Sequence, residues 1–132
     1  MDDTVSLNYC AGYFDGEGTI TLMTQTNKYG KTLYLRIALT TGDRESLSVF
    51  SRLFGGPVTV ESPRPFSKRP IFAWRKNGPK AQEVLKRLAP LLIAKKSKAE
   101  AALTLDFKRK GRAGISNVED LRRQVVRRMA GY

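Results

Sequence analysis

The residues best suited to chemistry are two carboxylates, Asp15 and Glu17, which alternate with Gly16 and Gly18 after a small, apolar stretch at residues 9–14. That stretch predicts a helix, and a helix C-terminus disfavours acidic side chains because its carbonyl groups carry partial negative charge. A hard divalent cation would offset the cost, since Mg²⁺ takes oxygen ligands from one or two carboxylates. The alternative is a plain helix stop, with the carboxylates as solvated turn residues.

The amino-acid composition limits which chemistry the chain can perform. It has no histidine, which excludes a histidine general base, a serine–histidine pair and histidine-ligated zinc. Catalysis must therefore use carboxylates, lysine and metal. The single cysteine, Cys10, excludes an intramolecular disulfide, and its place in an apolar helix predicts a small buried hydrophobe and not a nucleophile.

The charge balance predicts a polyanionic partner. Lys and Arg number 24 against 12 Asp and Glu, giving a net charge of +12 over 132 residues. Nucleic acid fits such a small basic domain better than a membrane surface. No apolar run approaches the roughly 18 residues of a membrane span, and the N-terminus lacks a secretory pattern. We expect a soluble, intracellular protein, not secreted, with no membrane partner and no small-molecule substrate, in a prokaryotic or phage-infected cytoplasm or an organelle.

Small residues recur at helical spacing before the carboxylates. Ala11 and Asp15, and Gly12 and Gly16, are four residues apart, which places them on one side of the helix. A helix face without side-chain bulk lets a second backbone approach closely. If the partner is the same helix of a second copy, a two-fold axis brings two Glu17 carboxylates together.

Hydrophobic periodicity predicts an α+β domain of order αββαββα, with a four-stranded antiparallel, saddle-like sheet and helices on one face. The expected helices cover residues 5–14, 44–54, 79–92, 95–107 and 116–128. Thr4 or Ser6 would cap the first helix and Asp43 the second, while Pro79 would begin the third, which is interrupted near Pro90. The expected strands cover residues 19–27, 33–39, 58–61 and 71–76. Residues 1–107 form the core, and residues 108–132 a basic helical extension of the same domain.

Alternation along the strands separates a buried face from an open one. The buried positions are Ile20, Leu22, Leu33, Leu35, Ile37 and Leu39. The open face offers side chains suited to a major groove, because Gln and Asn pair with adenine and Arg with guanine. Its members are Thr21, Met23, Gln25, Asn27, Tyr34, Arg36, Ala38, Thr59, Glu61 and Arg75. A simple solvent face is the alternative. Periodicity leaves open whether Phe72 and Trp74 or Ala73 and Arg75 face inward.

Basic residues outside the strands would extend such a contact. Arg64, Lys68 and Arg69 lie in the proline-rich loop between the last two strands and would reach flanking base pairs or phosphates. A tail group would mostly meet phosphates, which adds affinity and salt dependence without sequence information. It comprises Lys108, Arg109, Lys110, Arg112, Arg122, Arg123, Arg127 and Arg128.

The segment at residues 10–18, read Cys-Ala-Gly-Tyr-Phe-Asp-Gly-Glu-Gly, resembles the signature helix of the LAGLIDADG homing endonucleases, with residues 19–22 as their first strand. Cys10 replaces the usual leucine and Glu17 the commoner aspartate, two substitutions that the family uses. Residues 88–98 resemble the segment that carries an active-site lysine after a proline-containing helix, which favours Lys95. The resemblance covers about residues 7–107, and its single signature implies a homodimer.

The resemblance implies roles for individual residues. Glu17 and the backbone carbonyl of Gly16 would bind Mg²⁺, for which Mn²⁺ or Ca²⁺ substitutes in binding, and Asp15 would shape the helix corner and the dimer interface with Ala11 and Gly12. Lys95 would orient the hydrolytic water or stabilise the phosphate, with Lys96 and Lys98 as outer contributors or solvated lysines. Thr41 stands where the family often has a solvent-ordering glutamine, so we expect a sparser water network.

The sequence thus predicts a homodimeric, Mg²⁺-dependent endonuclease that hydrolyses both strands of a long, near-palindromic DNA site, encoded by a mobile intron or intein-like element. Two alternatives stay open. One is a non-cleaving intron maturase or DNA- or RNA-binding regulator with the same fold. The other is an RNA-binding module with stacked aromatics, for which Tyr34, Phe72 and Trp74 are the candidates.

Overall fold

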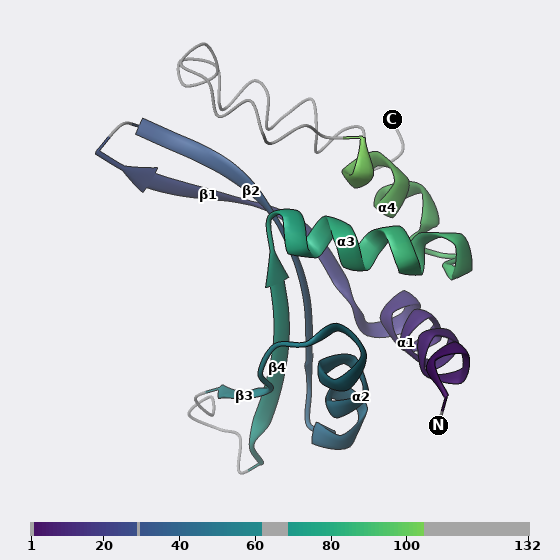
Figure 1. Ribbon diagram of the computed structural model, residues 1–132. Coiled ribbons are helices and arrows are strands. Elements are labelled where there is room, and N and C mark those ends of the chain that lie inside the picture. Colours follow the sequence, from purple (N-terminus) through teal and green to yellow (C-terminus); the bar gives the residue numbers. More distant parts are fainter. Residues whose placement is uncertain (1, 29, 62–68, 105–132) are drawn as a thin grey trace.

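A single antiparallel sheet and a layer of helices make up the part of the chain that the computed structural model describes, which is residues 2–28, 30–61 and 69–104 (Figure 1). The strands are β1 (Thr19–Asn27), β2 (Gly30–Thr41), β3 (Thr59–Glu61) and β4 (Ile71–Asn77), in the order β1-β2-β4-β3. The helices are α1 (Asp3–Glu17), α2 (Arg44–Phe54), α3 (Pro79–Leu88) and α4 (Lys96–Leu103), with a 3₁₀ turn η1 (Ala89–Leu91).

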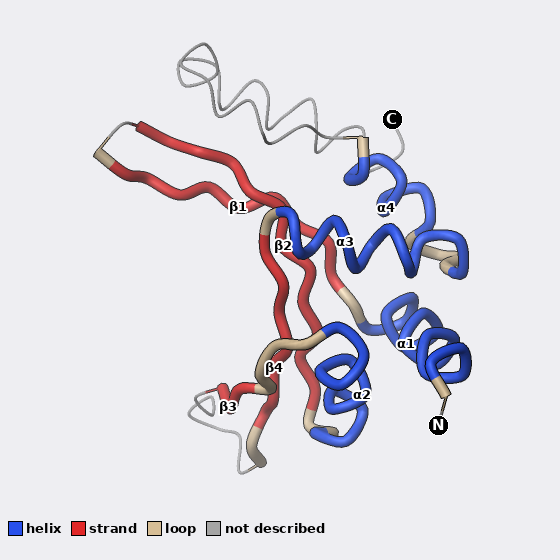
Figure 2. The backbone as a smooth tube through the Cα atoms, in the orientation of Figure 1, coloured by secondary structure: helices blue, strands red, loops and turns tan. Residues whose placement is uncertain are grey.

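The helices lie on one side of the sheet, as Figure 2 shows, so the predicted α+β architecture is confirmed. The end of the fourth expected helix beyond residue 104, the helix at 116–128 and the whole extension at 108–132 lie outside the described residues. None of the helices in the described part of the chain combines the length and the apolar character that a bilayer span requires.

The β1–β2 hairpin has the predicted buried and open faces. Ile20 lies opposite Ile37, and Leu22 lies opposite Leu35, in the antiparallel register. All four side chains are buried beneath the helices, together with Leu39. Because side chains alternate along a strand, the residues between them must face the other side of the sheet.

Helix α1 is longer than the sequence predicted. It begins at Asp3, and its N-cap is Asp2, whose carboxylate accepts a hydrogen bond of 2.9 Å from the Val5 amide, so the expected cap at Thr4 or Ser6 was wrong. At the other end the helix continues through Glu17. Gly18 follows, where a Cβ atom would lie 2.3 Å from the Phe14 ring, so only glycine fits this close approach.

Periodicity left open which side chains of β4 face the core, and the structure shows which do. Trp74 is fully buried under the helices, and its indole Nε1 donates a 3.0 Å hydrogen bond to the Gly55 carbonyl. Arg75 lies opposite Ala38 on the open face. Ala73 is buried as well although it lies on the face of Arg75, which explains why both sets of side chains looked suitable for the core.

Helix α3 and the turn after it lead the chain to the predicted lysine segment. Pro79 is in the first turn of α3, as expected, and the helix gives way to η1 at Ala89. The helix ends sooner than the predicted residue 92, and of the two leucines after Pro90, Leu91 is 41% exposed while Leu92 is buried. Pro90 lacks an amide hydrogen, which prevents the helical pattern from continuing through this turn.

Candidate active site and nucleic-acid interface

Asp15 joins the end of α1 to the turn before α4. Its carboxylate accepts hydrogen bonds from the backbone amides of Ile93 (3.1 Å), Ala94 (2.9 Å) and Lys95 (2.8 Å). These bonds hold the pKa of Asp15 below its ordinary value, with the Ala94 and Lys95 amides as the main causes. The charge that the α1 dipole disfavours is therefore stabilised by amides from a distant segment.

Lys95 completes this connection from the other side. Its ammonium Nζ donates a 2.7 Å hydrogen bond to the backbone carbonyl of Asp15. We call the Asp15 carboxylate and carbonyl, the amides of residues 93–95 and the Lys95 ammonium the Asp15–Lys95 junction. It fixes the lysine at the end of α1, two residues before Glu17.

Glu17 differs from Asp15 because it has no partner within the described part of the chain. Its side chain is exposed and makes no hydrogen bond or ion pair with the described residues. Both Asp15 oxygens are occupied, so Glu17 is the carboxylate at this corner that is available to a metal. A hard cation such as Mg²⁺ is commonly held by one or two carboxylates plus substrate phosphates, and the donors here fit that pattern. The described residues contain no group of three acidic or cysteine ligands.

The three residues expected at the periphery take different positions. Lys96 begins α4 and is exposed, and Lys98 is half-buried in the same helix. The Thr41 hydroxyl accepts a 3.2 Å hydrogen bond from the Asp43 amide, so it belongs to the turn that precedes α2. None of them is part of the Asp15–Lys95 junction.

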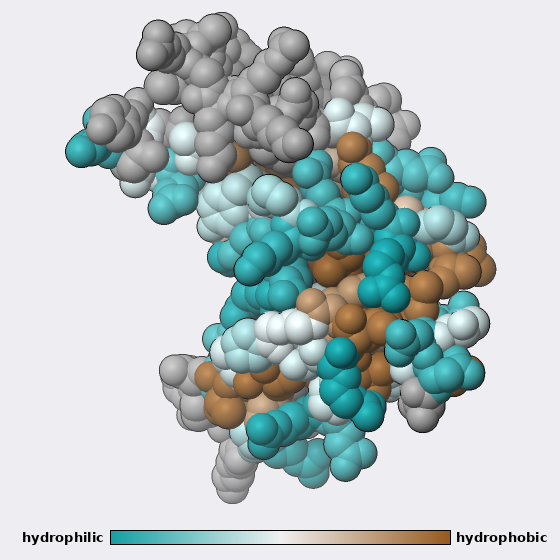
Figure 3. Space-filling view, viewed as in Figure 1, coloured by the Kyte–Doolittle hydropathy of each residue, from teal (hydrophilic) through white to brown (hydrophobic). Residues whose placement is uncertain are grey.

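The outer side of α1 is less polar than a solvated helix face. Gly12 is exposed, with open space where a Cβ would lie, while Tyr9 is 40% and Val5 51% exposed. Ile93, beside Asp15, is 87% exposed. Figure 3 shows hydrophobic residues gathered at this edge of the molecule, over α1 and η1. Ala11 departs from our expectation, because it is buried in the core of its own chain and is not part of this surface.

The open face of the sheet brings the predicted DNA-reading residues of neighbouring strands together. Thr21 pairs with Arg36, Met23 with Tyr34 and Gln25 with Thr32 across β1 and β2. On the β4 side, Ala38 lies opposite Arg75 and Ala73 lies opposite Thr59. The strands thus present their polar side chains on the face that the helices leave uncovered.

Both arginines of this face are oriented by acceptors on neighbouring strands. The Arg36 Nε donates a 2.9 Å hydrogen bond to the Asn77 side-chain carbonyl, and its guanidinium lies 5.8 Å from the centre of the Tyr34 ring. Arg75 forms an ion pair with Glu61. The Arg36 Nη2 also donates a 3.5 Å hydrogen bond to the Tyr34 hydroxyl, so three of its five N–H groups remain available, while Arg75 is partly neutralised.

Some predicted contacts lie beyond what the structure describes. Arg64 and Lys68 fall in residues 62–68, and the basic tail falls in residues 105–132, both outside the described residues. The side chain of Asn27 is also outside them. Arg69 is described and exposed.

Sequence reasoning missed two sets of partners. Nothing local pairs Asp15 with the amides of Ile93 and Ala94, since they are 78 and 79 residues away. Asn77 carried a usable signal, because it follows Arg75 by two positions and alternation places both on the open face.

Comparisons with solved structures identify the fold. A complex of the homing endonuclease I-CvuI with its target matches 96% of this chain and 83% of its own, with a TM-score of 0.67 and 18% identity. The archaeal intron-encoded homing endonuclease I-Vdi141I, complexed with DNA, matches 96% and 86%, with a TM-score of 0.67 and 15% identity. The chain has the fold of the LAGLIDADG homing endonucleases.

Other matches to the LAGLIDADG fold cover less of the compared protein. In a second I-CvuI complex the match spans 77% of this chain and 66% of that one, with a TM-score of 0.62 and 18% identity. The chain spans 41% of the LAGLIDADG homing endonuclease I-SmaMI bound to cleaved DNA, with 85% of its own length matched, a TM-score of 0.51 and 19% identity. No protein-family model and no curated protein matches the sequence.

Proposed function

We propose that this protein is a divalent-metal-dependent endonuclease that cleaves both strands of a long, near-palindromic DNA site as a homodimer. The observation that carries the proposal is that Glu17, a carboxylate with no partner among the described residues, lies at the same helix end at which the Asp15–Lys95 junction fixes Lys95. A nuclease without histidine can use this combination, because a metal ligand and a fixed cation can together serve phosphodiester hydrolysis.

Each residue of the corner has a defined task in the proposed reaction. Glu17 and the Gly16 carbonyl hold the cation, which would supply charge to the phosphate and acidify a water. Lys95 has three N–H donors and uses one on the Asp15 carbonyl, so two remain for a water or a phosphate oxygen. Asp15 does not bind metal but positions Lys95, and a prearranged donor of this kind stabilises charge as it develops.

The open sheet face is the proposed DNA surface. Arg36 can donate to guanine and Gln25 to adenine in a major groove, while Thr21, Met23 and Tyr34 provide hydroxyl and apolar contacts. A net charge of +12 supports the approach of the protein to DNA. The fold supports this assignment too, because I-CvuI and I-Vdi141I are both described in complexes with DNA.

The proposed homodimer is supported by the number of proposed metal sites, each formed by Glu17 and the Gly16 carbonyl. The described residues of one chain contain one such site, whereas the proposed cleavage of both strands uses two. The exposed Gly12 and the exposed apolar side chain of Ile93 support packing of α1 against its copy, with Ala11 behind it in the core. A two-fold protein requires a nearly two-fold DNA site.

A cleavage selection tests this function. The protein is incubated with Mg²⁺ and a randomised, partly palindromic duplex library, and the cut ends are sequenced. We expect discrete pairs of cuts, one on each strand, arranged about a dyad. Enrichment by binding with no cutting in Mg²⁺ or Mn²⁺ would contradict the nuclease and favour a maturase or regulator, and single-strand cuts without a dyad would contradict the homodimer.

A further inference from the structure

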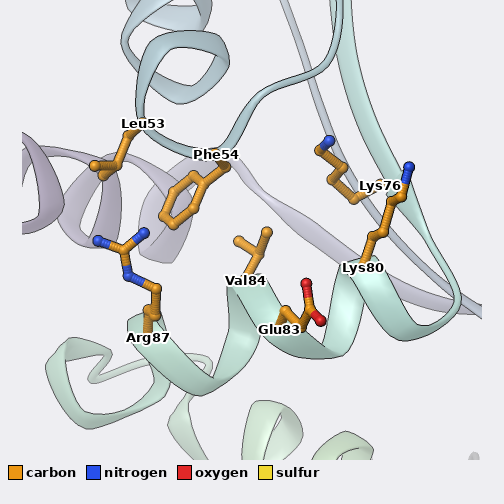
Figure 4. Close-up of a pocket in the computed structure, with 7 residues that line it drawn as sticks. All are labelled: Leu53, Phe54, Lys76, Lys80, Glu83, Val84 and Arg87. Carbon is orange, nitrogen blue, oxygen red and sulfur yellow. The ribbon is translucent and has the colours of Figure 1, made fainter.

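A basic hollow lies on the helix-covered side of the sheet, between the end of α2, β4 and α3 (Figure 4). Its volume is about 340 Å³, within the range of small-ligand sites. Lys76, Lys80 and Arg87 line it together with one acidic residue, Glu83. Three cations against one carboxylate leave a net charge of +2 around the hollow.

Lys76 is the most informative of these cations. It follows the buried Trp74 by two positions on β4 and lies opposite the buried Ile37, so its side of the strand is otherwise apolar. Its ammonium rests against Gly56, where a Cβ would lie 2.9 Å from Nζ. Yet it makes no ion pair or side-chain hydrogen bond with the described residues. A half-buried ammonium without a partner favours the binding of an anion.

The opposite wall of the hollow is aromatic and apolar. The Phe54 ring and Val84 line it, and the Arg87 guanidinium lies 5.1 Å from the centre of that ring. In Figure 4 the Phe54 ring points into the hollow, with Arg87 on one side and the two lysines on the other. Aromatic rings and guanidinium planes are the surfaces on which nucleobases stack.

We propose that this pocket binds a nucleoside phosphate. Lys76 and Lys80 take the phosphate, because an ammonium forms strong charge-assisted hydrogen bonds with it. Phe54 and Arg87 take the base. The pocket is on the opposite side of the sheet from Arg36 and Arg75, so it is separate from the proposed DNA-reading face. A free nucleotide and a nucleotide within a single strand present the same chemistry.

Titration calorimetry with ADP tests the site at about 150 mM salt, where exposed charges are largely screened. We expect Lys76→Gln and Lys80→Gln each to weaken ADP binding about tenfold, the loss of one charge-assisted contact. Lys86→Gln is the matched control, since it removes the same charge from the exposed part of α3 outside the pocket. It should change the dissociation constant less than about twofold. Circular dichroism checks that each variant is folded.

A second variant tests the base contact. Phe54→Leu should weaken ADP binding while leaving pyrophosphate binding unchanged. Failure of the native protein to bind ADP, equal losses in all three lysine variants, or pyrophosphate binding as tight as ADP would each overturn the proposal. If a 5′-phosphorylated tetrathymidylate displaces ADP, the result supports a single-strand ligand, and ADP binding without such competition supports a free nucleotide. None of these measurements depends on DNA cleavage.

Discussion

Asp15 and Asp43 both accept several hydrogen bonds through their carboxylates, but their partners lie at very different distances along the chain. Asp43 accepts hydrogen bonds from the Glu45 amide (3.1 Å), the Ser46 amide (3.4 Å) and the Ser46 hydroxyl (2.6 Å), all within three residues of itself. Asp15 accepts three amides that are 78 to 80 residues away. The first carboxylate begins its own helix, whereas the second connects two distant segments and brings Lys95 to the end of α1.

The function of a carboxylate that accepts backbone amides depends on which segments it connects. Loss of a local cap frees one helix end, so its effect is on stability. Loss of a long-range carboxylate contact such as that of Asp15 also releases the groups that it positions. The Asp43 region should therefore matter to folding, and the Asp15–Lys95 junction to the reaction.

The largest effect within this comparison should come from Lys95 itself. We expect Lys95→Gln to lower the single-turnover cleavage rate by about 10²- to 10³-fold, as for loss of one prearranged donor in an active site. DNA affinity, measured by fluorescence anisotropy in Ca²⁺, should change little. Lys86→Gln removes the same charge from an exposed position on α3, and a comparable loss of rate in that variant would show that the effect is only electrostatic.

The next effect separates the two aspartates directly. We expect Asp15→Ala to lower the cleavage rate by about 100-fold, because Lys95 loses its fixed position. Asp43→Ala should lower the urea midpoint of unfolding, because α2 loses its cap, with nearly unchanged cleavage by the folded protein. Urea unfolding and single-turnover cleavage measure both quantities for both variants.

The conservative variant Asp15→Asn identifies the role of Asp15. An amide side chain keeps one acceptor oxygen, so part of the junction should persist and the cleavage rate should lie between those of the native protein and Asp15→Ala. Equal cleavage rates in Asp15→Ala and Asp43→Ala, once both are folded, would contradict the difference between the two regions.

Features that depend on local contacts could be predicted from the sequence, whereas features that depend on long-range contacts could not. The cap at Asp43, the start of α3 at Pro79 and the two faces of the β1–β2 hairpin were predicted correctly, because each depends on neighbours in the chain or on strand alternation. The end of α1 was misplaced, because the stabilisation of Asp15 comes from residues 93–95. Trp74 was left undecided, since β4 buries Ala73 on its other face as well.

A smaller effect is expected on the sheet, away from both aspartates. Arg36→Ala should leave the maximal cleavage rate on the best site almost unchanged and reduce discrimination at one base pair by about 1–3 kcal/mol. Repeating the library selection with this variant measures the change in preference. An unchanged preference at every position would remove Arg36 from the reading face.

The smallest effect concerns pH. The Ala94 amide lowers the pKa of Asp15 first of all, and the Ser46 hydroxyl lowers that of Asp43, so both carboxyls hold protons less tightly in the folded state than in the unfolded one. Their contribution to stability is complete above the unfolded value of about 3.9 and is lost as the pH falls through the lower folded values. We expect the stability difference between the native protein and either Ala variant to shrink as the pH falls below about 4. Melting temperatures across that range would reveal a constant difference if this linkage were absent.

The central claim is that the corner at the end of α1 cuts DNA through the carboxylate of Glu17. Its most direct test is the cleavage of a selected site in Mg²⁺ by the native protein and by Glu17→Gln, with DNA binding measured in parallel in Ca²⁺. We predict that Glu17→Gln binds the site with nearly native affinity and produces no detectable cleavage on either strand. Full cleavage by the variant would contradict the assignment of the metal to Glu17 and would place the chemistry elsewhere in the chain.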